Sequence, residues 1–367
     1  MSARSRVRVV VADDSAISRK VLGDLVESSE EMELVASVKD GQDAVREVKN
    51  LSPDVLLMDV LMPGVDGLSA TAILMRESPL PIVLVSELVG RDADINFRAL
   101  EVGALDVLRK PASDELAGTA KGARFLRKIQ AYSRVPVVRR HGRAAPAAHD
   151  AGGDDAGSTA ARSTTLGEPG GELSMICIGA STGGPPAIRR IVAAVDGVLE
   201  VPMLICQHMT EGFMAGMSRW LNDEASNLRV SIAEDGERLV SGHVYLAPDN
   251  AHLRCEADRL RVSPGPDGAR HRPCIDFMFE SVADSVQCSS VIAMLLTGMG
   301  DDGANGLLRI RRAGGVTIAQ DEGSSVVFGM PKVAQSLGAA SQVLSLEDIA
   351  RRTRAECIAR RAVSVRG

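Results

Sequence analysis

Five side chains that suit phosphoryl chemistry follow apolar runs in the first third of the chain: Asp13, Asp14, Asp59, Ser86 and Lys110. If these runs are parallel strands, their carboxyl ends meet at one edge of a sheet. Three carboxylates in one place repel one another unless a hard divalent cation such as Mg²⁺ neutralises them. A lysine and a hydroxyl suit phosphoryl oxygens. Loop starts and helix caps explain one such Asp, but poorly explain five residues at matching strand ends.

A serine in the second half stands in a turn of the type that exposes nucleophiles. Residues 179–184 read GASTGG, which places Ser181 in a G-x-S-x-G pattern before a helical stretch that opens with two prolines. Such a turn presents the hydroxyl beside unpartnered backbone N–H groups, here near Thr182, Gly183 and Gly184. The pattern alone is weak, because many strand-to-helix turns contain it without catalysing anything.

Two further polar residues follow apolar runs expected to neighbour that of Ser181. His208 ends the next run, and Asp302 lies in the TGMGDDG stretch, residues 297–303. A lone histidine is more often structural, and an Asp in such a turn can simply cap a helix. Together at one crevice, however, the three would supply a nucleophile, a base and a residue that orients the base. The chain contains no HExxH motif or Cys/His cluster that would indicate a catalytic metal.

Apolar runs alternate with amphipathic stretches through the first 132 residues. Strands are predicted at 7–12, 33–38, 54–59, 82–86 and 105–108. Helices are predicted at 15–28, 41–51, 68–77, 94–102 and 114–132. Five strands alternating with five helices predict an α/β fold with a doubly wound, flavodoxin-like parallel sheet.

The second half shows a similar alternation with shorter β segments between. Buried strands are predicted at 175–179, 202–207 and 291–297, and shorter ones at 242–247, 252–255 and 260–262. This pattern predicts a second, Rossmann-like parallel α/β domain with an antiparallel insertion that contains His243, His252 and His271.

A long stretch without apolar periodicity separates the two halves. Of the 34 residues 139–172, 22 are Ala, Gly, Pro, Ser or Thr, and Leu166 is the only large apolar residue. Such a segment buries too little surface to offset its ordering entropy. We therefore predict a first domain at 5–132, a flexible linker at 133–173 and a second domain at 174–360.

Composition narrows the class of protein. The chain carries a net charge of −6 and 2% aromatic residues, which argues against a nucleic-acid-binding surface. Its longest apolar run, residues 291–296, is far shorter than the ~20 residues of a membrane helix, and no signal-peptide core follows the first arginines. Six scattered cysteines fit a reducing compartment. We expect a cytoplasmic protein without membrane insertion.

The first domain resembles the receiver domain of two-component response regulators over about residues 5–130. The motifs that carry the resemblance are the DD pair at 13–14, DVLMPG at 59–64, Ser86, and KP at 110–111. The resemblance implies that Asp59 accepts a phosphoryl group from a histidine kinase. It also implies that Mg²⁺ is held by Asp13, Asp14 and Asp59, with Ser86 and Lys110 responding to the phosphoryl group.

The second domain resembles the catalytic domain of chemotaxis protein-glutamate methylesterases over about residues 174–345. The motifs are GASTGG, QHM, YLAP, HRPCID, TGMGxDG and FGMP. The resemblance implies that Ser181, His208 and Asp302 catalyse hydrolysis of glutamate methyl esters on chemoreceptor signalling helices, releasing methanol without a cofactor. It implies deamidation of receptor glutamines as well, and it places Met299 near the oxyanion site.

The chain departs from both families at individual positions. Val107 stands where receiver domains usually carry an aromatic switch residue, and Thr210 and Met214 stand where methylesterases often carry Pro and Thr. These departures concern the switch and the mouth of the site, and they leave the predicted catalytic residues in place.

Two other output functions remain as alternatives. A DNA-binding output predicts a basic helical module, whereas residues 174–367 contain 20 Lys and Arg against 22 Asp and Glu. A nicotinamide-dependent oxidoreductase predicts a dinucleotide fingerprint, but Ser181 occupies the place of its middle glycine. The following run also ends in Gln207 and His208 where that fold requires an acidic residue.

Asp301 and Asp302 offer a test of the predicted orientation. Adjacent residues leave a turn in different directions, so only Asp302, at the x-D-G position, should reach His208. We expect Asp302→Asn to lower turnover by orders of magnitude, because the imidazole loses its preferred tautomer. Asp301→Asn is the matched control and should stay near the wild-type rate. Equal losses in the two variants, measured as ester hydrolysis, would refute this orientation.

Overall fold

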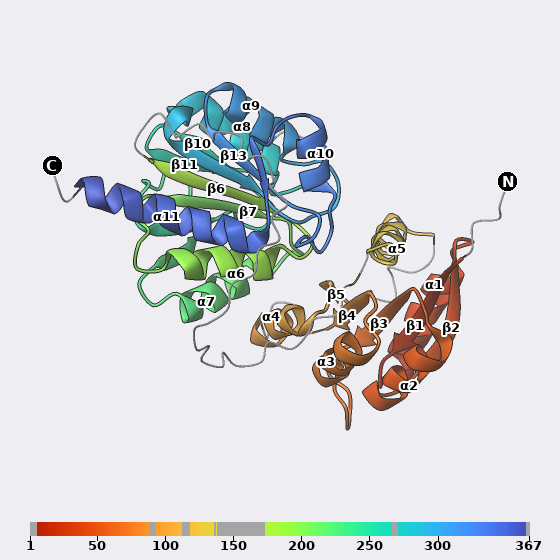
Figure 1. Ribbon diagram of the computed structural model, residues 1–367. Helices are drawn as coiled ribbons and strands as arrows, with labels where there is room; N and C mark the ends of the chain where they lie inside the picture. The colour runs from red at the N-terminus through yellow and green to blue at the C-terminus, as the bar shows by residue number, and fades with distance from the viewer. Residues whose placement is uncertain are drawn as a thin grey trace, which may run out of the picture.

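The two groups of alternating strands and helices form two α/β domains in the computed structural model (Figure 1). The structure describes residues 6–87, 93–111, 118–135, 137, 173–265 and 271–364. Most of the predicted linker and the first residues of the helix predicted at 114–132 lie outside these described residues. In the part of the chain that is described, no helix combines the length and apolar character that a membrane span requires.

The N-terminal sheet has five parallel strands in the order β2-β1-β3-β4-β5, which confirms the predicted flavodoxin-like arrangement. Its strands are β1 (Val7–Ala12), β2 (Met32–Val38), β3 (Val55–Asp59), β4 (Ile82–Ser86) and β5 (Asp106–Arg109). Its helices are α1 (Ala16–Glu27), α2 (Gly41–Leu51), α3 (Gly67–Glu77), α4 (Ala93–Val102) and α5 (Ala120–Tyr132).

Strand side chains of this sheet alternate between two buried faces. Leu56 and Met58 pack in one cluster with residues of α2, α3 and α4. Val55 and Leu57 pack in another with residues of α1 and α5. Burial on both faces explains why these strands are continuous apolar runs and why they were found from the sequence.

The C-terminal sheet has seven strands, all paired in parallel, in the order β14-β13-β12-β6-β7-β9-β8. Their bounds are β6 (Met175–Ala180), β7 (Met203–Gln207), β8 (Arg229–Ile232), β9 (His243–Leu246), β12 (Val291–Leu295), β13 (Val316–Gln320) and β14 (Gln342–Leu344). The strand order reverses at β6, because the chain adds β7 on one side of it and β12 on the other.

The predicted antiparallel insertion is smaller than expected. Among the strands of the described residues, only β10 (His252–Glu256) and β11 (Arg259–Ser263) form an antiparallel pair. The segment predicted at 242–247 is β9, which joins the main sheet, so His243 lies in that sheet. His271 lies beyond the hairpin and lines the pocket described below. Pairing of β9 depends on contacts with β7 and β8, which periodicity along one segment does not encode.

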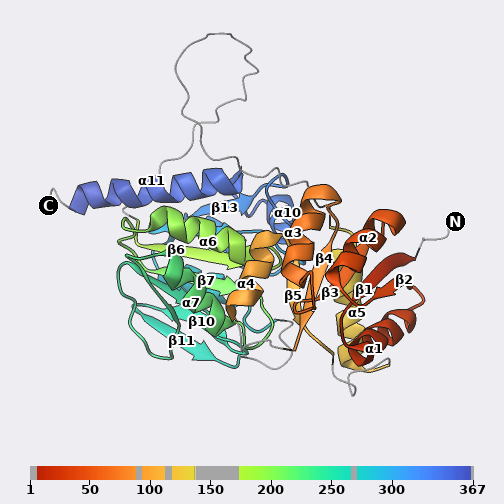
Figure 2. The same cartoon turned by 90° about the horizontal axis from the view of Figure 1, so that it is seen from below.

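Helices cover both faces of the second sheet (Figures 1 and 2). One face packs against α6 (Gly184–Val195), α7 (Met214–Glu224) and α11 (Leu346–Ser364). The opposite face packs against α8 (Ile275–Ser285), α9 (Ala304–Arg312) and α10 (Met330–Ser336), and a short 3₁₀ turn, η1 (Cys288–Ser290), precedes β12. All six cysteines are free, and five of them are buried.

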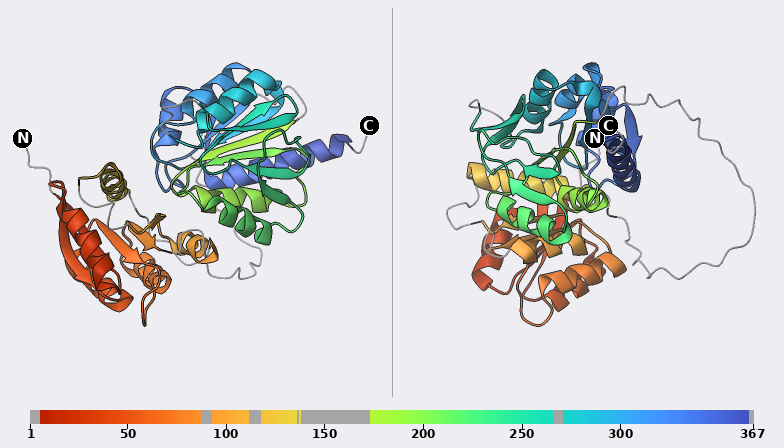
Figure 3. Two further views of the ribbon diagram at one scale, coloured as in Figure 1. Left: turned by 180° about the vertical axis from the view of Figure 1, so that it is seen from behind. Right: turned by 90° about the vertical axis from the view of Figure 1, so that its left-hand side faces the viewer.

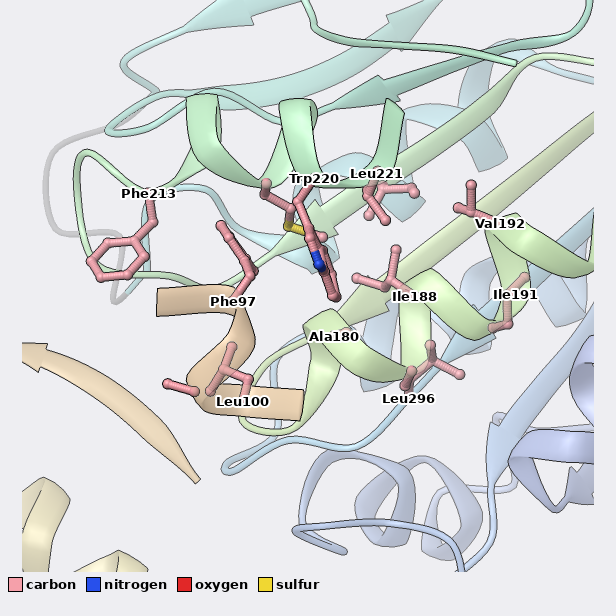
Figure 4. Close-up of a cluster of buried hydrophobic side chains, with 14 of the residues drawn as sticks. Phe97, Leu100, Ala180, Ile188, Ile191, Val192, Phe213, Trp220, Leu221 and Leu296 are labelled. Carbon is pink, nitrogen blue, oxygen red and sulfur yellow. The ribbon is translucent and has the colours of Figure 1, made fainter. Parts of the chain in front are cut away.

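The first domain meets the second through α4 and α5 (Figures 2 and 3). Phe97 of α4 stacks on Trp220 of α7, with ring centroids 4.9 Å apart and an interplanar angle of 19° (Figure 4). Arg189 of α6 lies over the same indole at 4.9 Å and forms an ion pair with Glu101 of α4. Phe97 is fully buried and Trp220 is 8% exposed. This contact excludes water from the only tryptophan of the chain.

Candidate active site

The reversal of strand order at β6 brings three chain segments to one crevice. Ser181 directly follows β6, His208 directly follows the neighbouring β7, and Asp302 lies in the loop between β12 and α9. The N–H of His208 donates to the carbonyl of Ala180 at 3.0 Å, so the ends of β6 and β7 are held in register. Ser181 and His208 line a pocket of about 720 Å³, in which Asp301 also takes part. In open α/β sheets, ligands usually bind in the crevice at the point where the strand order reverses.

Asp302 and His208 form a direct hydrogen bond, with 2.8 Å between Nε2 and Oδ2. The carboxylate also accepts the backbone N–H groups of Ile275 at 2.8 Å and Asp276 at 3.0 Å, at the start of α8. Burial by itself would raise the pKa of Asp302, but the hydrogen bond and charge of His208 and the two N–H groups lower it well below its usual range. Asp302 therefore stays ionised. Asp301 is exposed.

This hydrogen bond fixes the tautomer of His208. An ionised carboxylate only accepts hydrogen bonds, so Nε2 carries the proton. The second ring nitrogen, Nδ1, then has a free lone pair and is the atom able to take a proton from a nucleophile. The carboxylate of Asp302 thereby orients the imidazole of His208.

Ser181 is held by its main chain. Its N–H donates to the carbonyl of Thr297 at 3.0 Å, and its carbonyl accepts from the side-chain amide of Gln207 at 2.8 Å. Gly298 approaches so closely that a Cβ there would lie 2.7 Å from Cβ of Ser181. The nucleophile turn is therefore packed between the ends of β7 and β12, with the side chain left at the pocket.

The backbone around Ser181 provides donors at the start of α6. Gly183 is the N-cap residue, with φ 76°, a conformation that glycine adopts without strain. The N–H of Gly184 donates to the carbonyl of Ser181 at 2.8 Å, so it is already engaged. Thr182, Gly183 and Met299 all line the pocket. These three residues are where an oxyanion would be received.

Three polar residues of the HRPCID motif belong to this site, although the sequence analysis gave them no role. Asp276 accepts the N–H of Gly306 at 2.7 Å and so ties α8 to α9, and burial raises its pKa to about 6. Cys274 donates its thiol to Oδ1 of Asp302 at 3.2 Å. His271 stacks on His208. The motif itself was the available signal, but its distance of about 30 residues along the chain from Asp302 concealed the contact.

The residues predicted for phosphoryl chemistry meet at the edge of the first sheet. Asp13, Asp14 and Asp59 place carboxylate oxygens within 4.8 Å of one another. Nζ of Lys110 lies 2.8 Å from carboxylates of both Asp13 and Asp59. Burial, opposed by Lys110, raises the pKa of Asp59. Ser86 ends β4 and is buried at the same edge. Three oxygen donors of this kind suit a hard divalent cation such as Mg²⁺.

The first domain contributes one wall of the pocket that contains Ser181. Val107 of β5 is buried and lines this wall, together with Arg124 of α5. Tyr132 of α5 donates to Oδ2 of Asp106 at 2.5 Å and also contacts the side chain of Thr182, next to Ser181. Burial raises the pKa of Tyr132, so its hydroxyl stays protonated. Val107, which stands where receiver domains usually carry an aromatic switch residue, therefore faces the second domain.

A receiver domain joined to a parallel α/β domain with a Ser, His and Asp crevice defines a response regulator whose output is a hydrolase. Family models agree: "Response regulator receiver domain" matches residues 9–121, and "CheB methylesterase" matches residues 176–353. The chain belongs to the protein-glutamate methylesterase/protein-glutamine glutaminase family.

Named relatives match almost the whole chain. A protein-glutamate methylesterase/protein-glutamine glutaminase of Salmonella typhimurium is 38% identical over 98% of this chain and 100% of its own length. One of Myxococcus xanthus is 40% identical over 94% of this chain and 96% of its own. The crystal structure of the Thermotoga maritima CheB methylesterase catalytic domain matches with 32% identity and a TM-score of 0.46, covering 50% of this chain and 98% of that domain.

Cys274 generates a prediction about the support of Asp302. Burial, with the nearby charge of Asp302, raises the pKa of its thiol to about 12, so at pH 8 it remains a donor. We expect Cys274→Ala to lower kcat about 3–10-fold with little change in KM, because a hydrogen bond to a charged group is lost. Cys274→Ser keeps a donor and should retain most of the rate. Cys288→Ala, a buried cysteine in η1, is the control. Equal rates for the Ala and Ser variants would contradict the role of the thiol.

Proposed function

We propose that this chain is a phosphorylation-regulated hydrolase that removes methyl groups from glutamate γ-methyl esters of chemoreceptor signalling helices. The observation that carries the proposal is the hydrogen bond from His208 to a buried, ionised Asp302, in the pocket that also presents Ser181. The same acyl chemistry supports deamidation of receptor glutamines, with ammonia as the leaving group.

Hydrolysis proceeds in two acyl-transfer steps at Ser181. Nδ1 of His208 takes the hydroxyl proton while Oγ attacks the ester carbonyl, and the imidazolium then protonates the departing methoxide to give methanol. Water repeats the sequence on the acyl-enzyme, and it regenerates Ser181 and the glutamate carboxylate. Asp302 stabilises the imidazolium in both steps because its carboxylate stays ionised. No cofactor is needed for these steps.

Backbone N–H groups at Thr182 and Gly183 would receive the carbonyl oxygen as it gains negative charge. The start of α6 favours negative charge because the helix dipole has its positive end there. Removing one donor from such a hole typically costs about 10²–10³ in rate. Met299, which also lines the pocket, would limit the space available to the tetrahedral carbon.

The first domain would carry the phosphorylation that controls this reaction. Asp59 accepts the phosphoryl group from a histidine kinase, and Asp13, Asp14 and Asp59 would hold a Mg²⁺ ion that neutralises the charge of the transferred group. Lys110, now paired with Asp13 and Asp59, is placed to follow the new phosphoryl oxygens. Ser86 would respond at the same edge. The protein would act in the cytoplasm, where both kinase and receptor signalling helices are found.

Methanol release from methylated receptor tests the hydrolytic proposal. The wild-type chain should release methanol, and Ser181→Ala should reduce the rate at least about 10³-fold, because removal of the nucleophile leaves only binding and oxyanion contributions. Ser336→Ala, an exposed serine on α10, is the matched control and should behave as wild type. Methanol release that survives Ser181→Ala would overturn the assignment of the nucleophile.

Control by the first domain depends on the contact at α4 and α5. Interfaces between domains of one chain typically bury about 600–1,500 Å² and open for a few kcal/mol. Shifting the ratio of open to closed molecules from 1:99 to 99:1 needs about 5.5 kcal/mol. Phosphorylation at Asp59 would alter the ends of β4 and β5 through Ser86 and Lys110. Because Val107 carries no ring, we expect the segment that follows Ser86 to carry most of this change, and residues 88–92 of that segment lie outside the described residues.

Trp220 reports this opening directly, since its indole is covered by Phe97 of the first domain. We expect a small phosphodonor with Mg²⁺ to raise turnover and to shift the tryptophan emission to longer wavelength as water reaches the ring. Asp59→Asn should abolish both effects. Phe97→Ala, without the phosphodonor, should give part of the rise in turnover and part of the shift in emission. A rise in turnover with unchanged emission would show that activation does not separate α4 from α7.

A further inference from the structure

His271 is the residue of the pocket that the catalytic steps leave without a role. It stands at the start of the HRPCID motif, and its ring lies against that of His208. The two ring centroids are 4.4 Å apart and the rings are inclined by only 14°. His271 also lines the pocket together with Ser181 and His208. A nearly parallel stack on the proposed base is a geometry that a merely structural histidine need not adopt.

One hydrogen bond does not fix the plane of an imidazole. Asp302 holds Nε2 of His208 at 2.8 Å, but the ring can still tilt about the line joining those atoms. A tilt would move Nδ1 away from the hydroxyl of Ser181, and small misplacements of a base lower rates strongly. The flat face of His271 at 4.4 Å restricts this freedom, because a tilt toward that side brings the two rings into collision.

Charges face His271 from several elements. Asp302 and Asp301 lie on the loop after β12, His208 follows β7, and Arg124 lies on α5 of the first domain. Other titratable groups nearby are Arg127 and Lys128 of α5, and Arg272 and Cys274 of its own segment. Burial, then His208 and Arg124, lower the pKa of His271, and the two carboxylates oppose this only in part. The ring is therefore neutral at pH 7.

We propose that His271 is a positioning residue of the esterase site, whose neutral ring fixes the plane of His208 and receives the imidazolium against its face during catalysis. This inference rests on the proposed role of His208 as the base. A cation against an aromatic face is attracted by the ring quadrupole, so the contact strengthens when His208 takes the proton of Ser181. A contact that strengthens in the transition state raises kcat with little effect on KM.

Protonation of His271 reverses this effect. A charged His271 would face an imidazolium at 4.4 Å, and like charges at that distance oppose the protonation of His208 on which catalysis depends. Activity therefore requires both rings to start neutral.

The test is kcat and KM of the full chain at pH 8, measured as methanol release from methylated receptor without phosphodonor. His271→Ala should lower kcat about tenfold, the size of a partly buried cation–π contact, and leave KM within about twofold. His271→Phe restores a flat aromatic ring. It should recover kcat to within about threefold of wild type.

Two reference variants separate the possible failures. His243→Phe changes a histidine that stacks on Tyr245 in the main sheet, away from the pocket, and should keep the wild-type kcat and KM. His208→Gln should abolish turnover, and activity in this variant would refute the proposed base itself. With His208→Gln inactive, a wild-type kcat in His271→Ala overturns the positioning role. A kcat in His271→Phe as low as that of His271→Ala likewise overturns the inference.

Discussion

The parallel pairing of β6 with β7 on one side and β12 on the other is the constraint on which the site depends. Because the strands run in the same direction, their carboxyl ends fall at one edge, and the reversal of strand order opens a crevice there. Ser181 and His208 each follow their strand without an intervening residue, so the sheet itself sets the distance between them. The loop after β12 is longer, and Asp302 therefore needs anchoring of its own.

That anchoring comes from α8. An isolated buried carboxylate is costly, but Asp302 receives two backbone N–H groups at the helix start, the thiol of Cys274 and the imidazole of His208. The positive end of the helix dipole favours the same charge. Since these donors point at both carboxylate oxygens, they fix its orientation as well as its ionisation. The tautomer of His208 follows from that orientation, and so does the ring nitrogen that is left with a free lone pair.

The carboxylate cluster of the first sheet and the pocket that contains Ser181 are connected by β5, which contributes residues to both. β5 carries Val107 toward the pocket and is followed by Lys110 at the carboxylate cluster. On the adjoining α5, Tyr132 reaches Thr182, next to the nucleophile. A displacement of β5 or α5 therefore acts on both sites at once. The stack of Phe97 on Trp220 holds α4 against the second domain.

Much of this protein is determined by local sequence. The five strands and five helices of the first domain, its carboxylate cluster, and the turns of Ser181, His208 and Asp302 follow from buried apolar runs and the residues at their ends. Those patterns are local, so they can be predicted from the chain alone. β8, β13 and β14 were not predicted, and β9 was assigned to the insertion, because the pairing of short strands depends on neighbouring strands that lie elsewhere in the sequence. Only the tertiary structure decided that Cys274 supports Asp302 and that His271 stacks on His208. These contacts join segments far apart in the chain, and their geometry arises from how α8 packs against the sheet.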